Sequence, residues 1–148
     1  MAGTDTRTLD DTAVGTFKLG DRSVRRLGFG AMRISGARDA EGVRDRETAV
    51  RLTRRVVERG VNLIDTANIY GYGQSEEIIA EALHPYPDDL LVATRAGFRP
   101  GEIAPVSSVI LPIPGTSSIT HLDENVDAAW VDLTDDEVRA LDAAVGGR

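Results

Sequence analysis

The sequence predicts an α/β fold with parallel strands, and three stretches carry that prediction. An apolar run at residues 61–64 has the length of one buried strand, and a polar loop then leads into a helix that ends near residue 83. An amphipathic helix at residues 46–59 comes before this run, and a second strand-like run at residues 90–95 comes after it. In parallel α/β proteins, loops at the carboxyl ends of such strands carry the chemistry.

The length and composition predict a single domain without cysteine. The 148 residues suffice for a single core, which we place at residues 15–148 behind a polar, flexible segment of residues 1–14. Without cysteine there is neither a disulfide nor a thiolate metal site, and we expect no metal. Since no apolar run approaches the roughly 20 residues that span a membrane, we expect no membrane partner. The polar start predicts no signal peptide, so we expect a cytoplasmic protein.

Charged side chains are abundant and unevenly distributed. The net charge of −7 argues against nucleic acid as a partner. Residues 1–60 carry 13 basic and 9 acidic side chains, whereas residues 61–148 carry 4 basic and 15 acidic ones. Two interpretations stay open: solvated surfaces, or self-association between surfaces of opposite sign.

The first 33 residues predict a hairpin and then a glycine-bearing strand. Residues 16–19 and 23–26 flank a Leu-Gly-Asp-Arg turn. A strand is expected at residues 27–33, and its glycines Gly28 and Gly30 are typical of close approach between neighbouring strands.

Helix ends are marked by capping residues. The helix after the central strand is expected to have Ser75 as its N-cap. An apolar run from residue 109 leads into a Gly-Thr-Ser-Ser loop at residues 115–118, and a helix at residues 121–130 is expected to begin behind Thr120. Backbone N–H groups and hydroxyls at a helix N-terminus suit an anion, although a plain capping loop is the alternative. A capping box at Thr134 opens the last helix.

Residues 61–83 resemble the second strand–helix unit of an aldo-keto reductase. In that family the aspartate after the strand and the tyrosine in the loop belong to a four-residue site, where the tyrosine gives a proton to a carbonyl while a nicotinamide cofactor gives a hydride. The resemblance implies that Asp65 and Tyr70 are catalytic. The next strand ends in a lysine in the family and in Arg95 here. Arginine also favours a phenolate by its charge, but its planar fork points its donors differently from an ammonium.

The resemblance also implies NADP(H) as the cofactor. In the family the first barrel strand approaches the nicotinamide, and the loop and helix after the eighth strand hold the 2′-phosphate and the adenine end. The matching positions are Gly30, Met32, Pro114, Gly115, Thr116, Ser117, Ser118, Glu124 and Asn125. No arginine or lysine lies in residues 116–125 to pair with a second negative charge.

The resemblance covers two blocks. Residues 15–99 resemble the family's hairpin and its first three strand–helix units, and residues 106–145 resemble the eighth unit. We therefore expect strands four to seven to be missing. The family's catalytic histidine lies on strand four, and neither His84 nor His121 matches it. The nicotinamide-binding residues of strands five to seven also have no counterpart.

Four strands in the order eight, one, two, three cannot close a barrel, because a closed barrel needs about 250 residues and eight strands. We therefore expect a partial (β/α) barrel of about four parallel strands plus an N-terminal hairpin. Its outer strands would leave unpaired backbone N–H and C=O groups at their edges. Two copies pairing edge to edge would cover them, so the expected partner is a second copy in a homodimer.

Three functions stay open. The first is NADP(H)-linked reduction of a small-molecule carbonyl in a site completed by a second subunit, with Tyr70 as the acid, Asp65 as its support and Arg95 as the tuning charge. The second is a redox-inactive enzyme of the isomerase or cyclase type that uses the same three residues for acid–base chemistry. The third is a non-catalytic barrel fragment or assembly module.

Overall fold

The structure is a computed structural model that describes residues 7–37, 42–95 and 113–145. Its elements, in chain order, are α1 (Asp11–Val14), β1 (Thr16–Leu19), β2 (Arg22–Arg25), β3 (Phe29–Gly30), η1 (a 3₁₀ helix, Ala31–Gly36), α2 (Arg46–Glu58), β4 (Leu63–Ala67), α3 (Gln74–Leu83), β5 (Leu91–Arg95), α4 (Ile119–Asp127), η2 (a 3₁₀ helix, Ala128–Trp130) and α5 (Asp135–Val145).

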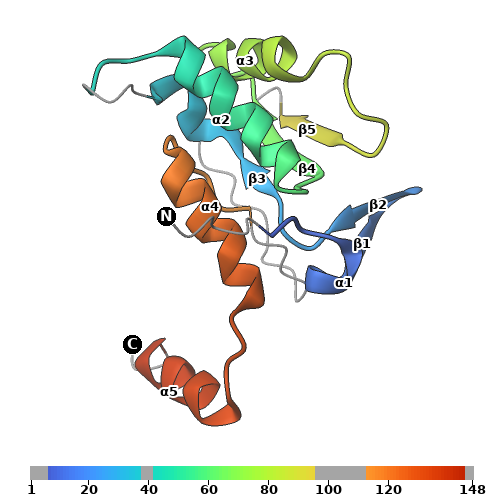
Figure 1. Cartoon of the computed structure of the whole chain (residues 1–148), viewed down its shortest axis with the longest axis vertical. Coiled ribbons are helices and arrows are strands. Elements are labelled where there is room, and N and C mark those ends of the chain that lie inside the picture. Colours follow the sequence, from blue (N-terminus) through green and yellow to red (C-terminus); the bar gives the residue numbers. More distant parts are fainter. Residues whose placement is uncertain (1–6, 38–41, 96–112, 146–148) are drawn as a thin grey trace, which may run out of the picture.

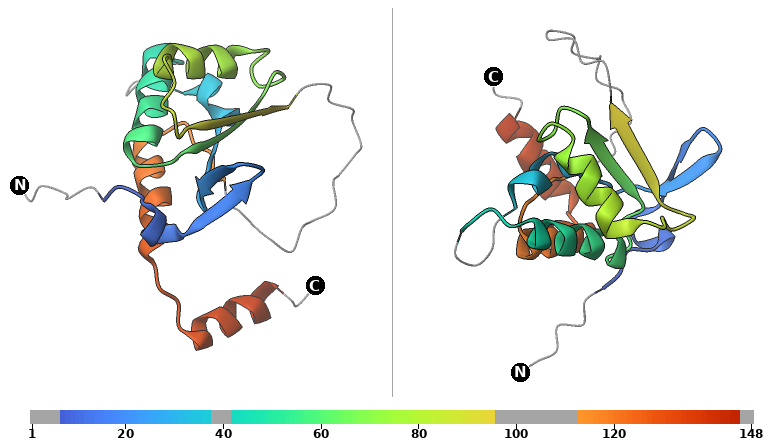
Figure 2. Two further views of the ribbon diagram at one scale, coloured as in Figure 1. Left: turned by 90° about the vertical axis from the view of Figure 1, so that its right-hand side faces the viewer. Right: turned by 90° about the horizontal axis from the view of Figure 1, so that it is seen from above.

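Two sheets organise the chain. Strands β3, β4 and β5 form a parallel sheet in that order, which confirms the predicted parallel α/β arrangement. Strands β1 and β2 form the predicted antiparallel hairpin. Helices α2, α3 and α4 lie along one face of the parallel sheet, and among the described residues no helix covers the other face (Figure 1, Figure 2). The core lies between this sheet and the helices and includes Phe29, Leu52, Val56, Ile64, Ile78, Ile79, Leu122 and Val126.

One edge of the sheet is covered by the chain segment that precedes α4. The N–H of Gly30 donates to the carbonyl oxygen of Pro114 at 3.3 Å. A Cβ at Gly115 would lie 2.3 Å from the Gly30 oxygen, and a Cβ at Gly30 would lie 2.8 Å from the Ile113 oxygen. Such distances exclude a side chain at either glycine, so close packing accounts for Gly30. The run predicted as a strand from residue 109 lies outside the described residues up to residue 112.

The opposite edge of the sheet is open in the described part of the chain. Strand β5 pairs with β4 on one side, in a register that places Arg95 beside Ala67. No described strand pairs with its other side. Within the described residues, its backbone N–H and C=O groups on that side therefore have no strand partner.

The predicted strand at residues 27–33 is wrong beyond Gly30. Only Phe29 and Gly30 pair with β4, and the chain then turns into η1. The reason is the spacing of the apolar residues: Ala31 and Ile34, three positions apart, are both buried, and three residues make one turn of a 3₁₀ helix. Met32, a predicted cofactor-binding residue, is consequently exposed on this helix.

Two helices begin earlier than predicted. Helix α3 is capped by Gly73, not Ser75, because the Ser75 side chain is buried inside the first turn. Helix α4 is capped by Ser118, not Thr120, and the Ser118 hydroxyl accepts from the His121 N–H at 3.4 Å. This helix also ends at Asp127, and η2 continues to the predicted end at residue 130.

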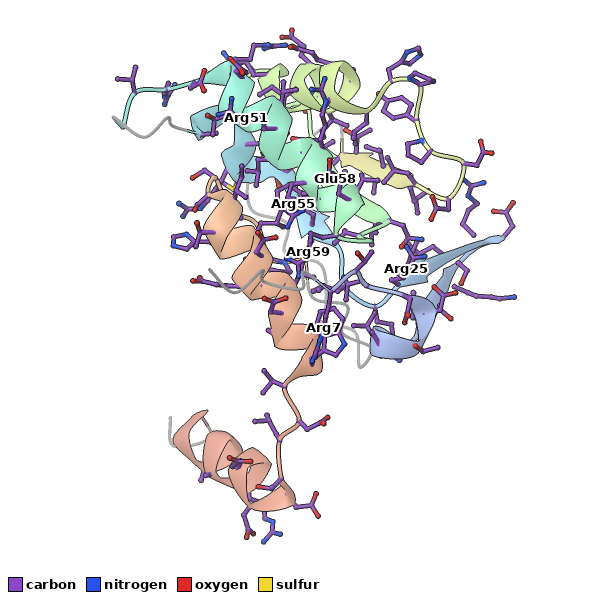
Figure 3. All side chains as sticks on the ribbon, viewed as in Figure 1. Arg7, Arg25, Arg51, Arg55, Glu58 and Arg59 are labelled. Carbon is purple, nitrogen blue, oxygen red and sulfur yellow. The ribbon has the colours of Figure 1, made fainter. Side chains whose placement is uncertain are left out.

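A buried arginine joins α2 to α4. Arg59 ends α2 and is only 1% exposed. Its guanidinium forms ion pairs with Asp123 and Asp127 of α4, and its Nε donates to the Arg7 carbonyl oxygen at 2.9 Å. Arg55, one turn earlier, also reaches Asp123 at 3.2 Å. Figure 3 shows these arginines between the two helices. The pairs attach the segment from residue 113 onward to the N-terminal half.

The first described residues of the chain contact the end of α2. The N–H of Leu9 donates to the Arg59 carbonyl oxygen at 2.9 Å, and the Leu9 side chain is buried. Gly60 has φ +83°, and a Cβ there would lie 2.2 Å from the Leu9 oxygen. Residues 7–14 thus contact the core within the segment for which flexibility was expected; residues 1–6 lie outside the described set.

Helix α5 stands apart from the other elements (Figure 1). It opens with the predicted capping box, in which the Thr134 N–H donates to a Glu137 carboxylate oxygen at 2.8 Å and the Glu137 N–H donates to the Thr134 hydroxyl at 3.4 Å. Its described side chains are all exposed. None of the described helices is long and apolar enough to cross a membrane.

Candidate functional site

The three predicted catalytic residues come together at the carboxyl ends of β4 and β5. Asp65 lies in β4, Arg95 is the last residue of β5, and Tyr70 lies in the loop after β4. Arg95 is in register with Ala67, two residues beyond Asp65, so the two side chains belong to the same face of the sheet. Thr66 belongs to the other face, where it contacts α3. The site therefore lies on the face without described helices.

A single nitrogen of Arg95 connects the other two residues. Its Nη2 donates to Asp65 Oδ2 at 2.7 Å and to Tyr70 Oη at 2.6 Å. The guanidinium carbon lies 5.7 Å from the centre of the Tyr70 ring. The planar guanidinium of Arg95 was expected to point its donors differently from a lysine ammonium. Here a single terminal nitrogen bonds to both Asp65 and Tyr70, as a lysine nitrogen would.

The direction of these hydrogen bonds defines what Tyr70 can do. An arginine N–H is only a donor, so the Tyr70 oxygen must accept from Arg95. The phenolic O–H of Tyr70 is then left to donate to another group. Asp65, with its side chain 18% exposed, holds the more exposed guanidinium in place. The arrangement is a tyrosine whose phenolic oxygen accepts a hydrogen bond from a positively charged arginine, which Asp65 holds in place.

The loop that carries Tyr70 has an unusual backbone. The N–H of Tyr70 donates to the Ala67 oxygen at 2.9 Å. The next three residues, Gly71, Tyr72 and Gly73, all have positive φ angles of 60°, 55° and 92°. A Cβ at Gly71 would lie 2.8 Å from Ser35 Cβ, so only glycine fits there. A non-glycine residue at positive φ is strained, and such strain often accompanies functional loops.

A buried pair of hydroxyls fixes this loop to the sheet. The hydroxyls of Thr66 and Ser75 lie 2.9 Å apart, and the Ser75 hydroxyl donates to the Ala31 carbonyl oxygen at 3.1 Å. Sequence reasoning assigned Ser75 to the helix cap and missed this role. The available signal was spacing, because Ser75 lies on the same helical face as the apolar Ile78 and Ile79.

Most of the predicted cofactor-binding residues lie where the end of β3 meets the segment that precedes α4. Gly30 and Gly115 pack against each other, and Pro114 accepts a hydrogen bond from Gly30. The hydroxyl of buried Thr116 accepts from the Ser118 N–H at 3.0 Å. Ser118 caps α4, and the last two predicted positions, Glu124 and Asn125, lie further along this helix.

Three of the cavities on the described surface lie near this region, and Asp65, Tyr70 and Arg95 line none of these three. Ser117 and Met32 line one of about 360 Å³, beside the loop that carries Tyr70. Asn125 lines a mainly apolar one of about 630 Å³ on the hairpin side. Tyr70 and Asp65 are half-buried beside the first cavity, whereas Arg95 is exposed.

Neither histidine belongs to the site. His84 lies in the loop after α3, edge-on to the Tyr86 ring with the ring centres 5.8 Å apart. His121 lies in the first turn of α4 and is exposed. Among the residues that the structure describes, no group of three or more histidine, aspartate or glutamate side chains could hold a metal ion.

Comparisons with known proteins identify relatives of part of the chain. The sequence model described as "Aldo/keto reductase family" matches residues 26–107, more than half of the chain. "Pyridoxine 4-dehydrogenase" of Escherichia coli (strain K12) is 47% identical over 89 residues, which are 60% of this chain and 31% of that protein. "NADH-specific methylglyoxal reductase" of the same organism is 35% identical over 78 residues, 52% of this chain and 24% of that protein.

Solved structures of aldo-keto reductases also align with part of the chain. The aldo-keto reductase AKR11C1 from Bacillus halodurans, in its holo form, is 32% identical and aligns with a TM-score of 0.47 over 59% of this chain and 28% of that chain. The chain thus spans about a third or less of the length of the relatives that it matches.

Proposed function

The chain belongs to the aldo/keto reductase family, and from that premise we propose that it is an oxidoreductase that reduces a carbonyl group of a small molecule, with Tyr70 as the proton donor. The hydrogen bond from Arg95 Nη2 to Tyr70 Oη carries this proposal, because it leaves the phenolic proton free to be donated. A nicotinamide cofactor, when bound, supplies the hydride.

Each of the three site residues has a distinct role in the proton transfer. Tyr70 donates its proton to the carbonyl oxygen as negative charge develops there. The phenolate that remains is stabilised by the positive charge of Arg95, 2.6 Å from its oxygen. Asp65 accepts from the same nitrogen and so orients Arg95 toward Tyr70. Asp65 is a positioning residue in this scheme.

The loop that precedes α4 has the chemistry to hold a phosphate-bearing cofactor such as NADP(H). Helix α4 has no acidic residue in its first turn, and no acidic side chain among the described residues lines the cavity beside Ser117. Backbone N–H groups at a helix N-terminus favour anions. We propose that Ser117 contacts the phosphate-bearing end. One relative is named as NADH-specific, so NADH and NADPH must both be tried.

We also propose that a second copy completes the site. Strand β5 has an open edge among the described residues, and Asp65, Arg95 and Tyr70 lie at the sheet face that no described helix covers. Edge-to-edge pairing would place a second wall opposite this face. The expected light-scattering mass is about twice the 15.9 kDa of one chain. A mass of one chain, with and without NADPH, would exclude the dimer.

The decisive experiment follows nicotinamide absorbance at turnover. Methylglyoxal with NADH or NADPH, and pyridoxine with the oxidised cofactors, are the first pairs to test, since the relatives are named for these compounds. Tyr70→Phe is expected to lower kcat about 100-fold or more, because general acid catalysis contributes 10² to 10⁴-fold. Tyr86→Phe, which changes an exposed tyrosine in another loop, is the control. Equal turnover in both variants would exclude Tyr70 as the proton donor.

One observation favours a second candidate function. Asp65, Tyr70 and Arg95 form their hydrogen bonds among themselves and do not line the cavity that Ser117 lines, so their acid–base chemistry does not require a cofactor there. A supported phenol can also protonate a carbonyl substrate without hydride transfer, as in an isomerisation. Proton exchange next to a carbonyl, measured by NMR in D₂O without any nicotinamide, tests this candidate. Exchange that is unchanged in Tyr70→Phe would exclude it.

A further inference from the structure

We propose that the cavity between η1, the start of α3 and Ser117 binds a phosphoryl group, which is held by Arg33 and Arg44. The cavity has a volume of about 360 Å³, within the range of small-molecule sites. Arg33 lies on η1, and Arg44 lies immediately before the N-cap residue of α2. Two guanidinium groups from separate segments therefore meet at one hollow.

The charge of this cavity contrasts with the rest of the molecule. The chain carries a net charge of −7, and about half of the described arginines are paired with carboxylates, as Arg46 is with Glu81 at 2.8 Å. Within the described residues, Arg33 and Arg44 have no acidic partner, and no acidic side chain lines the cavity. The carboxylate nearest in sequence, Asp45, instead accepts from the backbone and hydroxyl of Thr48. No described carboxylate therefore competes with an external anion for these two charges.

Neutral donors complete the cavity. Ser35, Gln74 and Ser117 line it together with the two arginines. Gln74 is the first residue of α3, and its N-cap, Gly73, offers no side chain to the helix N-terminus. The positive end of the helix dipole therefore lies beside the arginines, while the two glutamates of this first turn, Glu76 and Glu77, do not line the cavity. Two planar guanidinium groups and hydroxyl donors are suited to the several oxygens of a phosphate.

The two arginines also supply the positive charge that the segment of residues 116–125 lacks. Residues 116–125 suit an anion but contain no arginine or lysine. Folding brings Arg33 and Arg44, more than 70 positions earlier in the chain, into the cavity that Ser117 lines. The phosphoryl group has two possible sources, a nicotinamide dinucleotide or a phosphorylated substrate. Phosphoryl binding does not depend on the proposed reduction, so each can fail without the other.

The test is titration calorimetry of the full chain with inorganic pyrophosphate and inorganic phosphate at low ionic strength. Arg33→Gln and Arg44→Gln are each expected to weaken pyrophosphate binding about tenfold, and the double variant more, because each removes a charge-assisted contact. Added salt is expected to weaken binding to the wild type more than to the double variant. Arg26→Gln is the matched control, since Arg26 is also exposed and lines another cavity.

Three results decide the proposal. Pyrophosphate binding that is lost in the double variant and kept in Arg26→Gln supports it, provided that circular dichroism shows all the proteins to be folded. No pyrophosphate or phosphate binding to the wild type, or equal weakening in all variants, overturns it. NADPH titration by nicotinamide fluorescence then identifies the source. If the double variant binds NADPH more weakly, as it binds pyrophosphate more weakly, the dinucleotide supplies the phosphoryl group. Unchanged NADPH binding in the double variant points to a phosphorylated substrate.

Discussion

Replacing Arg59 with methionine tests whether the ion pairs between α2 and α4 hold the two halves of the chain together. The guanidinium is 1% exposed and bonds to Asp123, Asp127 and the Arg7 carbonyl oxygen. Removing one member of a buried ion pair typically costs about 3–5 kcal/mol, because a charge is left without its partner. Here the freed carboxylates can hydrate, since Asp123 is 30% and Asp127 is 62% exposed.

We therefore expect the loss in unfolding free energy to lie at the lower end, about 3 kcal/mol. For a chain of this length that corresponds to a fall in Tm of roughly 6–12 °C. Arg54→Met is the control: Arg54 lies on the same helix, is exposed, and donates to the Ala82 carbonyl oxygen at 3.2 Å. Its loss is expected to stay within about 0.5 kcal/mol.

Urea denaturation provides the assay, with two probes. Trp130 is the only tryptophan, and it lies at the end of η2 with the Arg7 guanidinium carbon 5.6 Å from its ring centre. Its fluorescence therefore reports the contact of this segment with the N-terminal half, while circular dichroism reports the helices as a whole. In Arg59→Met the fluorescence transition is expected at lower urea than in the wild type. An equal free energy in Arg59→Met and Arg54→Met would refute the reasoning.

Three further variants follow from the structure. Asp45→Ala removes the N-cap of α2. Hydrogen bonds, first from the Thr48 hydroxyl and then from the Thr48 N–H, hold the pKa of Asp45 below its ordinary value of 3.8. The stabilisation of the folded protein by this cap is therefore present at neutral pH and is lost as the pH falls through that lowered pKa. The variant should melt a few degrees lower at pH 7, and the two melting temperatures should approach each other as the pH falls through the lowered pKa of Asp45. Gly115→Ala should cost about 1–3 kcal/mol by overpacking against Gly30, whereas Gly36→Ala, with nothing within 4 Å, should be neutral in urea denaturation. Arg95→Lys should keep turnover within about tenfold while Arg95→Met loses it, because one nitrogen serves both partners; equal loss would show that the guanidinium fork is required.

Periodicity predicted the parts of the fold in which local pattern and tertiary contacts agree. The helix at residues 46–59, the hairpin and the strands at 61–64 and 90–95 were found within a few residues of their predicted bounds. Asp65, Tyr70 and Arg95 were named from the sequence by resemblance, and the structure brings them within hydrogen-bonding distance. The resemblance was sufficient there because Asp65 and Arg95 lie on neighbouring paired strands and Tyr70 lies in the loop that directly follows β4.

Features set by contacts between distant residues were not predictable in this way. The strand expected at residues 27–33 ended at Gly30, because residues 113–115 and the burial of Ile34 decide the course of the chain. Ser75 was assigned to a cap because its partner Thr66 lies on another element. The meeting of Arg33 with Arg44, and the pairing of Arg59 with α4, likewise depend on tertiary structure and leave no local signal.

The contact between Gly30 and Gly115 limits how this protein can evolve. Both residues already lack a side chain, so a larger residue at one cannot be compensated by a smaller one at the other. Related sequences with this arrangement should therefore vary neither position, and should not show the paired changes by which other contacts adapt. Changes in how closely residues 113–115 pack against the sheet must instead come from substitutions at apolar neighbours, such as Ile113.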